Sequence, residues 1–200
     1  MENERIKFYE QGHLYLLDDW LIIPCVSDIL SFIFPDKYEG IPKWILENKA
    51  KYGTKVHKVI QDLEEQNLEY INVNDIYVDI AQEQYKKLKD QYKLDVLSQE
   101  QIIHYKDEYA GRLDMIALVN KKLCLIDIKT TAELDLEYLS WQLSLYELAF
   151  GKRFSSLYCL WLPKSKEGQL VKIKRKTKKE ILENLGEFKK WKKKKQENKQ

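Results

Sequence analysis

Two acidic residues and one lysine stand in this sequence at positions where charge is costly. Asp127 and Lys129 lie near the end of the apolar segment LCLIDIKT, and Asp114 lies within GRLDMIALV. Strand alternation would turn Asp127 and Lys129 to the same face. Burying a carboxylate and an ammonium is unfavourable unless something engages them. We therefore expect the three residues to form one polar site.

The chemistry that suits this site is the binding of a hard divalent cation. A short turn separates the two strands, so Asp114 can approach Asp127 across the ladder. Two carboxylates a few ångströms apart repel each other unless a cation lies between them. Mg²⁺, or Mn²⁺ in its place, takes one or two carboxylates and keeps positions for water and phosphate. Lys129 could then orient a water and offset negative charge in the transition state.

Each feature also has a plainer interpretation. An Asp-x-Lys sequence on a strand is more often an ion pair at a strand end. An isolated Asp in a strand can belong to a turn or a cap. The conjunction of all three residues, rather than any one of them, favours a catalytic site.

The first third of the chain predicts a hairpin and helices. The segment 7–17 reads as an N-terminal hairpin. A short helix follows, with Ser27 as its N-cap, and residues 42–52 form a second helix that ends at Gly53. From Thr54 a new amphipathic helix begins, which places His57 in its first turn. A further helix covers 75–92.

The middle of the chain predicts a mixed sheet. Segments 96–106, 112–119 and 123–130 read as a three-stranded antiparallel meander. A helix over 135–150 then leads to a continuously apolar strand over 156–162. A right-handed crossover would make that strand parallel to the third one. The fold class is therefore α/β, a mixed central β-sheet flanked by helices in the order α-β-β-β-α-β.

Length and charge indicate one domain with a basic appendage. We expect a single domain over 1–176 and a basic helix or tail over 177–200, in which Thr177 and Glu180 are spaced as a capping box. Residues 171–200 hold 13 Lys/Arg against 4 Asp/Glu, although the net charge of the whole chain is only +2. This segment could bind phosphates, remain a solvated terminus, or dock another chain through Trp191.

The three cysteines are single and widely spaced, which predicts neither a disulfide framework nor a paired-cysteine zinc site. No segment has the length of apolar sequence that a membrane span needs, and the first residues do not look like a secretory leader. We expect a cytoplasmic protein without a membrane partner.

Four segments together resemble a known family. They are GTKVHKVIQ, GRLDMIA, IDIKT after twelve residues between Asp114 and Asp127, and WQLSLYELA. This pattern resembles the PD-(D/E)XK nuclease superfamily, in particular its RecB-nuclease-like and phage-exonuclease-like branch, over about residues 24 to 165. The resemblance implies a restriction-endonuclease-like core and a Mg²⁺- or Mn²⁺-dependent DNA nuclease, most often an exonuclease on linear DNA.

The resemblance also assigns roles around the metal. It implies that Asp114 and Asp127 ligate the ion, that the Ile128 backbone carbonyl is a third ligand, and that Lys129 is the catalytic lysine. His57 would approach the ion or serve a second one. The plainer alternative for His57 is a surface histidine in a first helical turn.

Further residues are implied with their alternatives left open. Glu100 matches an acidic residue that serves as a metal or water ligand. Gln142 and Tyr146, at i and i+4 on one helix face, would bind DNA or brace the catalytic strand, or else belong to a packed helix face. Arg112 would contact phosphate or form a salt bridge on the sheet surface.

Two departures from the family pattern matter. The second acid is Asp127 where many members have Glu, and its shorter arm demands closer metal placement. Some members hold an iron–sulfur cluster with four cysteines, which three scattered cysteines cannot do, so we expect no iron–sulfur cluster.

The implied partner is DNA, with a helicase, single-strand-binding or annealing protein and a homo-oligomer left open. A phage-encoded origin in a host cytoplasm would suit the compact, Lys- and Tyr-rich chain. Other hypotheses are a structure-specific endonuclease, and a module that kept the fold, lost catalysis and binds DNA or a partner.

Overall fold

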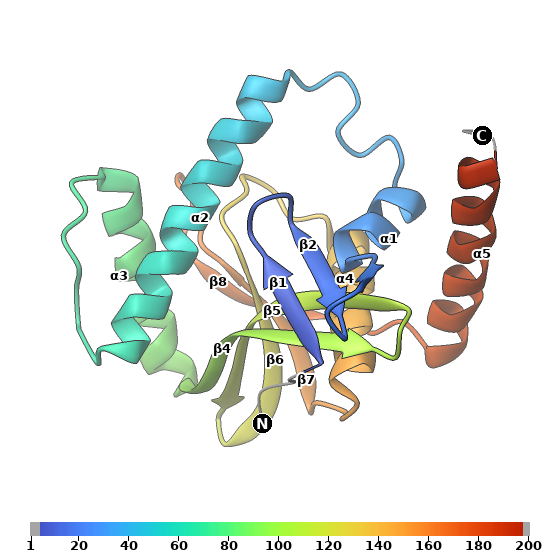
Figure 1. The fold of residues 1–200 in the computed structure, drawn as a ribbon. Helices are drawn as coiled ribbons and strands as arrows, with labels where there is room; N and C mark the ends of the chain where they lie inside the picture. Colours follow the sequence, from blue (N-terminus) through green and yellow to red (C-terminus); the bar gives the residue numbers. More distant parts are fainter. Residues whose placement is uncertain (1–4, 198–200) are drawn as a thin grey trace.

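The computed structural model describes residues 5–197 and places a five-stranded mixed sheet at the centre of the molecule (Figure 1). Its strands are β4 Asp95–Tyr105, β5 Tyr109–Val119, β6 Lys122–Lys129, β7 Ser156–Trp161 and β8 Gln169–Ile173. The sheet order is β4-β5-β6-β7-β8, and only β6 and β7 pair in parallel. The expected meander, the crossover and the mixed α/β fold class are confirmed.

Helices cover both faces of this sheet. They are α1 Val26–Ile33, α2 Lys43–Glu65, α3 Ile76–Tyr92, α4 Leu136–Phe150 and α5 Lys178–Glu197. One buried cluster joins α2 and α3 to the sheet, and another joins α1, α4 and α5 to it. In Figure 1 these two groups of helices lie on opposite sides of the view. The order α3-β4-β5-β6-α4-β7 is the predicted α-β-β-β-α-β.

The N-terminal segment forms a small second sheet, of strands β1 Ile6–Tyr9, β2 Leu14–Leu17 and β3 Leu21–Ile23. The predicted hairpin is confirmed, whereas β3 was not foreseen. The sheet is anchored to the large one where Ala110 N–H donates to the Pro24 carbonyl at 2.9 Å. Its buried side chains pack against Ala110 and Ile102 of the β4–β5 hairpin.

The predicted N-cap of α1, Ser27, was wrong by two residues. Cys25 occupies the N-cap, and its own N–H donates to the Asp28 carboxylate at 2.8 Å. Ser27 lies inside the helix. The Cys25 backbone pairs with Ala110 in an isolated bridge, so a tertiary contact, rather than the hydroxyl preference of N-caps, sets the boundary.

The predicted break at Gly53 was also wrong. Helix α2 runs without interruption through Gly53 and Thr54, so His57 lies in its interior and not in a first turn. A helical glycine costs only about 1 kcal/mol relative to alanine. Burial of an apolar stripe on α3 and the sheet exceeds that cost, and the stripe is Val56, Val59, Ile60 and Leu63.

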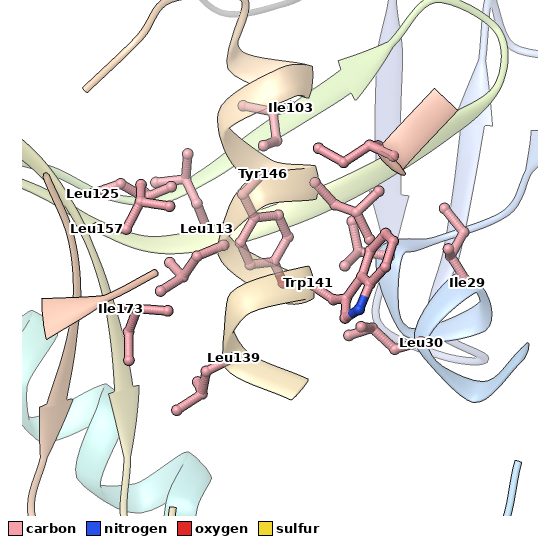
Figure 2. Packing of buried hydrophobic residues seen from close by; sticks show 14 of the residues in the cluster. Ile29, Leu30, Ile103, Leu113, Leu125, Leu139, Trp141, Tyr146, Leu157 and Ile173 are labelled. Carbon is pink, nitrogen blue, oxygen red and sulfur yellow. The ribbon is translucent and has the colours of Figure 1, made fainter. Parts of the chain in front are cut away.

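Helix α4 forms the centre of the second core. It begins at Asp135, whose carboxylate accepts from Tyr138 N–H at 2.9 Å, and it ends before Gly151 in a left-handed conformation. Figure 2 shows the Tyr146 and Trp141 rings projecting from α4 among apolar side chains of the sheet and α1. This helix therefore fixes the face of the sheet that carries Leu113 and Leu125.

The C-terminal helix α5 is docked against the same core. Thr177 and Glu180 form the predicted capping box, with Thr177 N–H donating to the Glu180 carboxylate at 2.7 Å. Ile181, Leu185 and Phe188 are buried, and Trp191 packs on Phe32 and Phe188 of the same chain. Among residues 5–197, no helix has the length and apolar character needed to cross a membrane.

A glycine on β5 tests this packing. A Cβ at Gly111 would lie 2.6 Å from Cε1 of the buried Tyr146 ring, whereas a Cβ at Gly186 in α5 would meet nothing within 4 Å. We expect Gly111→Ala to lower the free energy of unfolding in urea by about 1–3 kcal/mol. Gly186→Ala, the matched control, should raise it by up to about 1 kcal/mol. Equal stability of the two variants would contradict the placement of Tyr146 against β5.

Candidate metal centre

The register of the sheet brings three carboxylates, from Glu100, Asp114 and Asp127, close to one another on neighbouring strands. Gln99 and Gln101 of β4 pair with Met115 and Leu113 of β5, so Glu100 stands opposite Asp114. Met115 pairs with Ile126 at the end of the β5–β6 ladder, and Asp114 and Asp127 are the next residues of the two strands beyond that pair. Asp127 in turn pairs with Cys159 of β7. Three carboxylates from adjacent strands therefore line one strip of the sheet.

Asp114 replaces a strand partner for β6. Regular β5–β6 pairing stops at Met115, and beyond it the Asp114 side chain accepts the Ile128 N–H through Oδ2 at 2.7 Å. This bond satisfies a backbone donor that the ladder leaves open. It fixes the carboxylate, and Oδ1 remains directed at His57, 3.8 Å from Nδ1.

Asp127 is the most deeply buried acidic residue of the site, with 1% of its surface exposed. Lys129 Nζ lies 2.7 Å from Asp127 Oδ2, but the contact lacks hydrogen-bond geometry. Burial raises the pKa of the Asp127 carboxyl to about 6, Lys129 opposes that rise, and the charge of Asp114 adds to it. The carboxylate is thus held in an environment that a further positive charge would stabilise.

Lys129 keeps its charge in this setting. Burial by itself would lower the pKa of Lys129, but the charges of Asp127 and Asp114 outweigh burial and raise it. The side chain is a quarter exposed. Its ammonium therefore stays protonated near neutral pH and can act as an electrostatic group rather than as a base.

His57 enters the site from the interior of α2. Its Nε2 lies 3.1 Å from the Ile128 carbonyl oxygen, and its Nδ1 lies 3.9 Å from Glu100 Oε1. Burial alone would lower the pKa of His57, but Asp114 and Glu100 outweigh it and raise the pKa to about 9. The ring is therefore protonated near neutral pH, and a metal ion at Nδ1 would take the place of the Nδ1 proton.

One group of side chains could hold a metal ion. Donor atoms of His57, Glu100 and Asp114 all lie within 4.8 Å of one another. Asp127 stands outside this group, held by its ion pair with Lys129, and the Ile128 carbonyl already faces His57. The structure thus brings the predicted ligands to one place but gives Asp127 a different partner.

Glu100 and Arg112 form an ion pair beside these donors. Arg112 Nε lies 2.8 Å from Glu100 Oε2, and the guanidinium lies 5.0 Å from the centre of the Phe8 ring. Glu100 has φ +50°, a left-handed conformation that is costly within a strand. The salt-bridge alternative for Arg112 is the arrangement found, and it orients Glu100 towards His57.

Gln142 and Tyr146 lie behind the row of carboxylates. Gln142 Nε2 lies 3.5 Å from the Tyr146 hydroxyl on one face of α4. The pKa of the Tyr146 phenol is raised well above its usual range, first by burial and then by the charges of Asp114 and Asp127. The pair therefore lies on a packed face of α4 that adjoins Asp114 and Asp127.

Unpartnered polar atoms concentrate at this place. Within the described residues, the buried side-chain oxygens and nitrogens without a hydrogen-bond partner are both carboxylate oxygens of Asp127, Gln142 Oε1 and Gln84 Oε1. Buried polar atoms are nearly always paired in native proteins. Three of these four atoms belong to the candidate site: Asp127 Oδ2 already has the Lys129 ammonium 2.7 Å away, whereas Asp127 Oδ1 and Gln142 Oε1 could meet a cation or its water.

Some of the surroundings could not be foreseen from sequence patterns. Cys159 faces Asp127 and has a raised thiol pKa, chiefly through burial; its place on a buried strand was apparent, but its register was not. Phe8 beneath Arg112 joins segments about a hundred residues apart, and no local signal connects them. The left-handed Glu100 has no signature in residue type.

Comparison with protein-family models gives no match, and comparison with curated proteins gives none either. Among solved structures, the protein described as "Crystal structure of SSO0001" is similar over 81% of this chain and 72% of its own, with 16% identity and a TM-score of 0.43. So slight a likeness does not define a family.

The donor group can be tested by metal titration. We expect Mn²⁺, followed by calorimetry, to bind the wild-type protein, and Asp114→Asn to weaken binding by more than the roughly 10- to 100-fold that loss of an outer partner causes. The Asn amide oxygen can still accept from Ile128 N–H, so the fold should persist. Asp95→Asn, an exposed position on β4, is the control. Unchanged affinity in Asp114→Asn would refute the site.

Proposed function

We propose that the chain is a divalent-metal-dependent nuclease that hydrolyses DNA phosphodiesters at this site. The observation that carries the proposal is the buried Asp127 carboxylate, which has no hydrogen bond of its own and stands in a row with Asp114 and Glu100 beside Lys129. Two or three carboxylates and one ammonium in a buried strip suit a metal ion and a phosphate better than they suit a hydrophobic core.

The residues that would hold the ion are Asp114, Glu100 and His57 Nδ1, with Asp127 joining them once an ion competes with Lys129 for its oxygen. The Ile128 carbonyl remains a candidate ligand through its second lone pair. Mg²⁺ or Mn²⁺ suits the carboxylates, and Mn²⁺ suits the imidazole better. When bound, such an ion polarises the phosphate and lowers the pKa of a coordinated water.

The chain's own groups supply the rest of the mechanism. Asp127, if it held the ion through one carboxylate oxygen, could accept a hydrogen bond from the attacking water through the other oxygen and so align that water. The Lys129 ammonium, released from Asp127, can contact a non-bridging phosphate oxygen and stabilise the charge that develops there. Asp114, held by the Ile128 N–H, cannot rotate away. Lys129 would therefore contact the substrate phosphate only when it is no longer paired with Asp127.

The finer assignment is an exonuclease on linear DNA, and it is proposed from the family resemblance. A structure-specific endonuclease would use the same residues. A helicase, single-strand-binding or annealing protein as partner, a homo-oligomer, and a phage-encoded protein in a host cytoplasm belong to the same proposal.

The competing hypothesis is a DNA-binding or partner-docking module without catalysis. Its prediction is DNA binding that persists in chelator, with no metal-dependent cleavage. Against it, Asp114, Asp127 and Lys129, the residues that hydrolysis would need, are all present. Trp191, the residue considered for docking another chain, is engaged within the chain by Phe32 and Phe188.

Cleavage is tested with end-labelled linear duplex, linear single strand and closed circular DNA in Mg²⁺, Mn²⁺ or chelator. We expect metal-dependent loss of linear DNA, reduced about 100-fold or more in Lys129→Met, which keeps the length of the side chain and removes its charge. Lys122→Ala, exposed at the start of β6, is the control. Metal binding should persist in Lys129→Met, and full cleavage by that variant would exclude Lys129 from the reaction.

The basic face of α5 can be tested without removing the helix, whose apolar side is part of the core. Lys193 and Lys194 are exposed. If they bind phosphates, the double change to Gln should weaken DNA binding equally for all sequences and lower the slope of log K against log salt by about 1 to 2. Fluorescence anisotropy across a salt series measures this slope. An unchanged slope would remove α5 from the DNA interface.

A further inference from the structure

A hollow lies beside the candidate metal centre, between the first half of α2 and the segment that follows β6. Its volume is about 300 Å³, within the range of small ligand sites. The lining residues are Trp44, Ile45, Asn48, Lys49, Tyr52, Thr130, Thr131, Ala132, Lys164 and Ser165. The catalytic mechanism uses none of them.

The hollow is next to the candidate metal centre because residues that line it directly follow Lys129 in the sequence. Thr130 and Thr131 directly follow Lys129, and Trp161 Nε1 donates to the Thr131 carbonyl at 2.7 Å, which fixes this wall. The opposite wall is the helix that carries His57. Trp44 lies thirteen residues before His57 on α2, so the two are about 20 Å apart along the helix axis. A polymer bound at the metal centre could therefore extend along α2 and place a later unit in the hollow.

Aromatic rings form the wall on α2. The indole of Trp44 is 64% exposed, although tryptophan is usually well buried. The Tyr52 hydroxyl donates to the Tyr77 carbonyl at 3.0 Å, which fixes its ring. Lys164 Nζ stands 3.8 Å from the centre of that ring and 4.5 Å from the centre of the Tyr77 ring. The wall thus offers rigid flat surfaces with a cation beside them.

The charge of the lining selects the occupant. Lys49 and Lys164 are its charged members, and it contains no carboxylate among the described residues. A suitable ligand must therefore present flat apolar faces together with negative charge. Unpaired bases joined by phosphates have this combination, because aromatic side chains stack on bases while lysines neutralise the backbone. An apolar peptide would leave both ammonium groups without a partner.

We propose that this hollow stacks an unpaired base of single-stranded DNA whose phosphodiester lies at the metal centre. The proposal rests on the function proposed above and adds its substrate class, a single strand or a single-stranded end. Inside a duplex the faces of the bases are already covered by their neighbours, so internal duplex positions cannot use Trp44. The site should read no sequence, since every base has a π-face.

The test is the binding of fluorescein-labelled oligothymidylate in chelator, where no cleavage occurs, measured by anisotropy. Trp44→Ala should weaken binding about 5- to 100-fold, the loss expected for one base–aromatic stack. Trp44→Phe, which keeps a ring, should recover part of it. Trp20→Ala removes an equally exposed tryptophan, 74% exposed near β3, and should leave binding unchanged. A blunt-ended duplex of two complementary strands, which has no loop, should bind Trp44→Ala and the wild type alike.

Two results would overturn the proposal: an affinity of Trp44→Ala for oligothymidylate equal to that of Trp20→Ala, or an equal loss for the blunt duplex. Hydrolysis of bis(p-nitrophenyl) phosphate by the wild-type protein with Mn²⁺ tests the proposed nuclease activity independently of the stacking site. That small diester reaches the metal centre without a base to stack. Failure to hydrolyse it counts against the nuclease, whereas the binding comparison alone decides the stacking site.

Discussion

The hydrogen bond from the Ile128 N–H to Asp114 is the interaction on which the candidate site depends. Regular pairing of β5 with β6 ends one residue earlier, and the side chain takes over the role of a backbone acceptor. The strands can therefore part while no backbone donor is left unpaired. This parting makes room for Asp127 and Lys129 at the strand end, and it leaves the Ile128 carbonyl free to meet His57 from α2.

The charges of the site are arranged as interlocking pairs. Lys129 holds Asp127, Arg112 holds Glu100, and His57 stands between Glu100 and Asp114. Each acid thus has a cation near it, which lets a row of carboxylates exist within a largely apolar fold. Arg112 also lies against the ring of Phe8.

The sequence predicts the features of this site that neighbouring residues determine, and it does not predict those that contacts between distant segments determine. The proximity of Asp114, Asp127 and Lys129 follows from strand alternation and a short hairpin, and both are properties of neighbouring residues. The continuity of α2 through Gly53 is decided by packing on α3 and the sheet, which outweighs a local preference. The N-cap at Cys25 is set by a bridge to Ala110. The left-handed Glu100 and the wall built by Trp44 and Thr130 join distant segments, so no spacing in the sequence encodes them.

The contact between Phe8 and Arg112 connects the first strand of the chain to the row of carboxylates. The aromatic ring of Phe8 restricts the position of the Arg112 guanidinium, and the guanidinium in turn restricts the position of the Glu100 carboxylate. The amino-terminal hairpin is thus more than a cover for hydrophobic surface. A change in its register would reach Glu100 through Arg112, in addition to its effect on the packing against Ala110 and Ile102 of the central sheet.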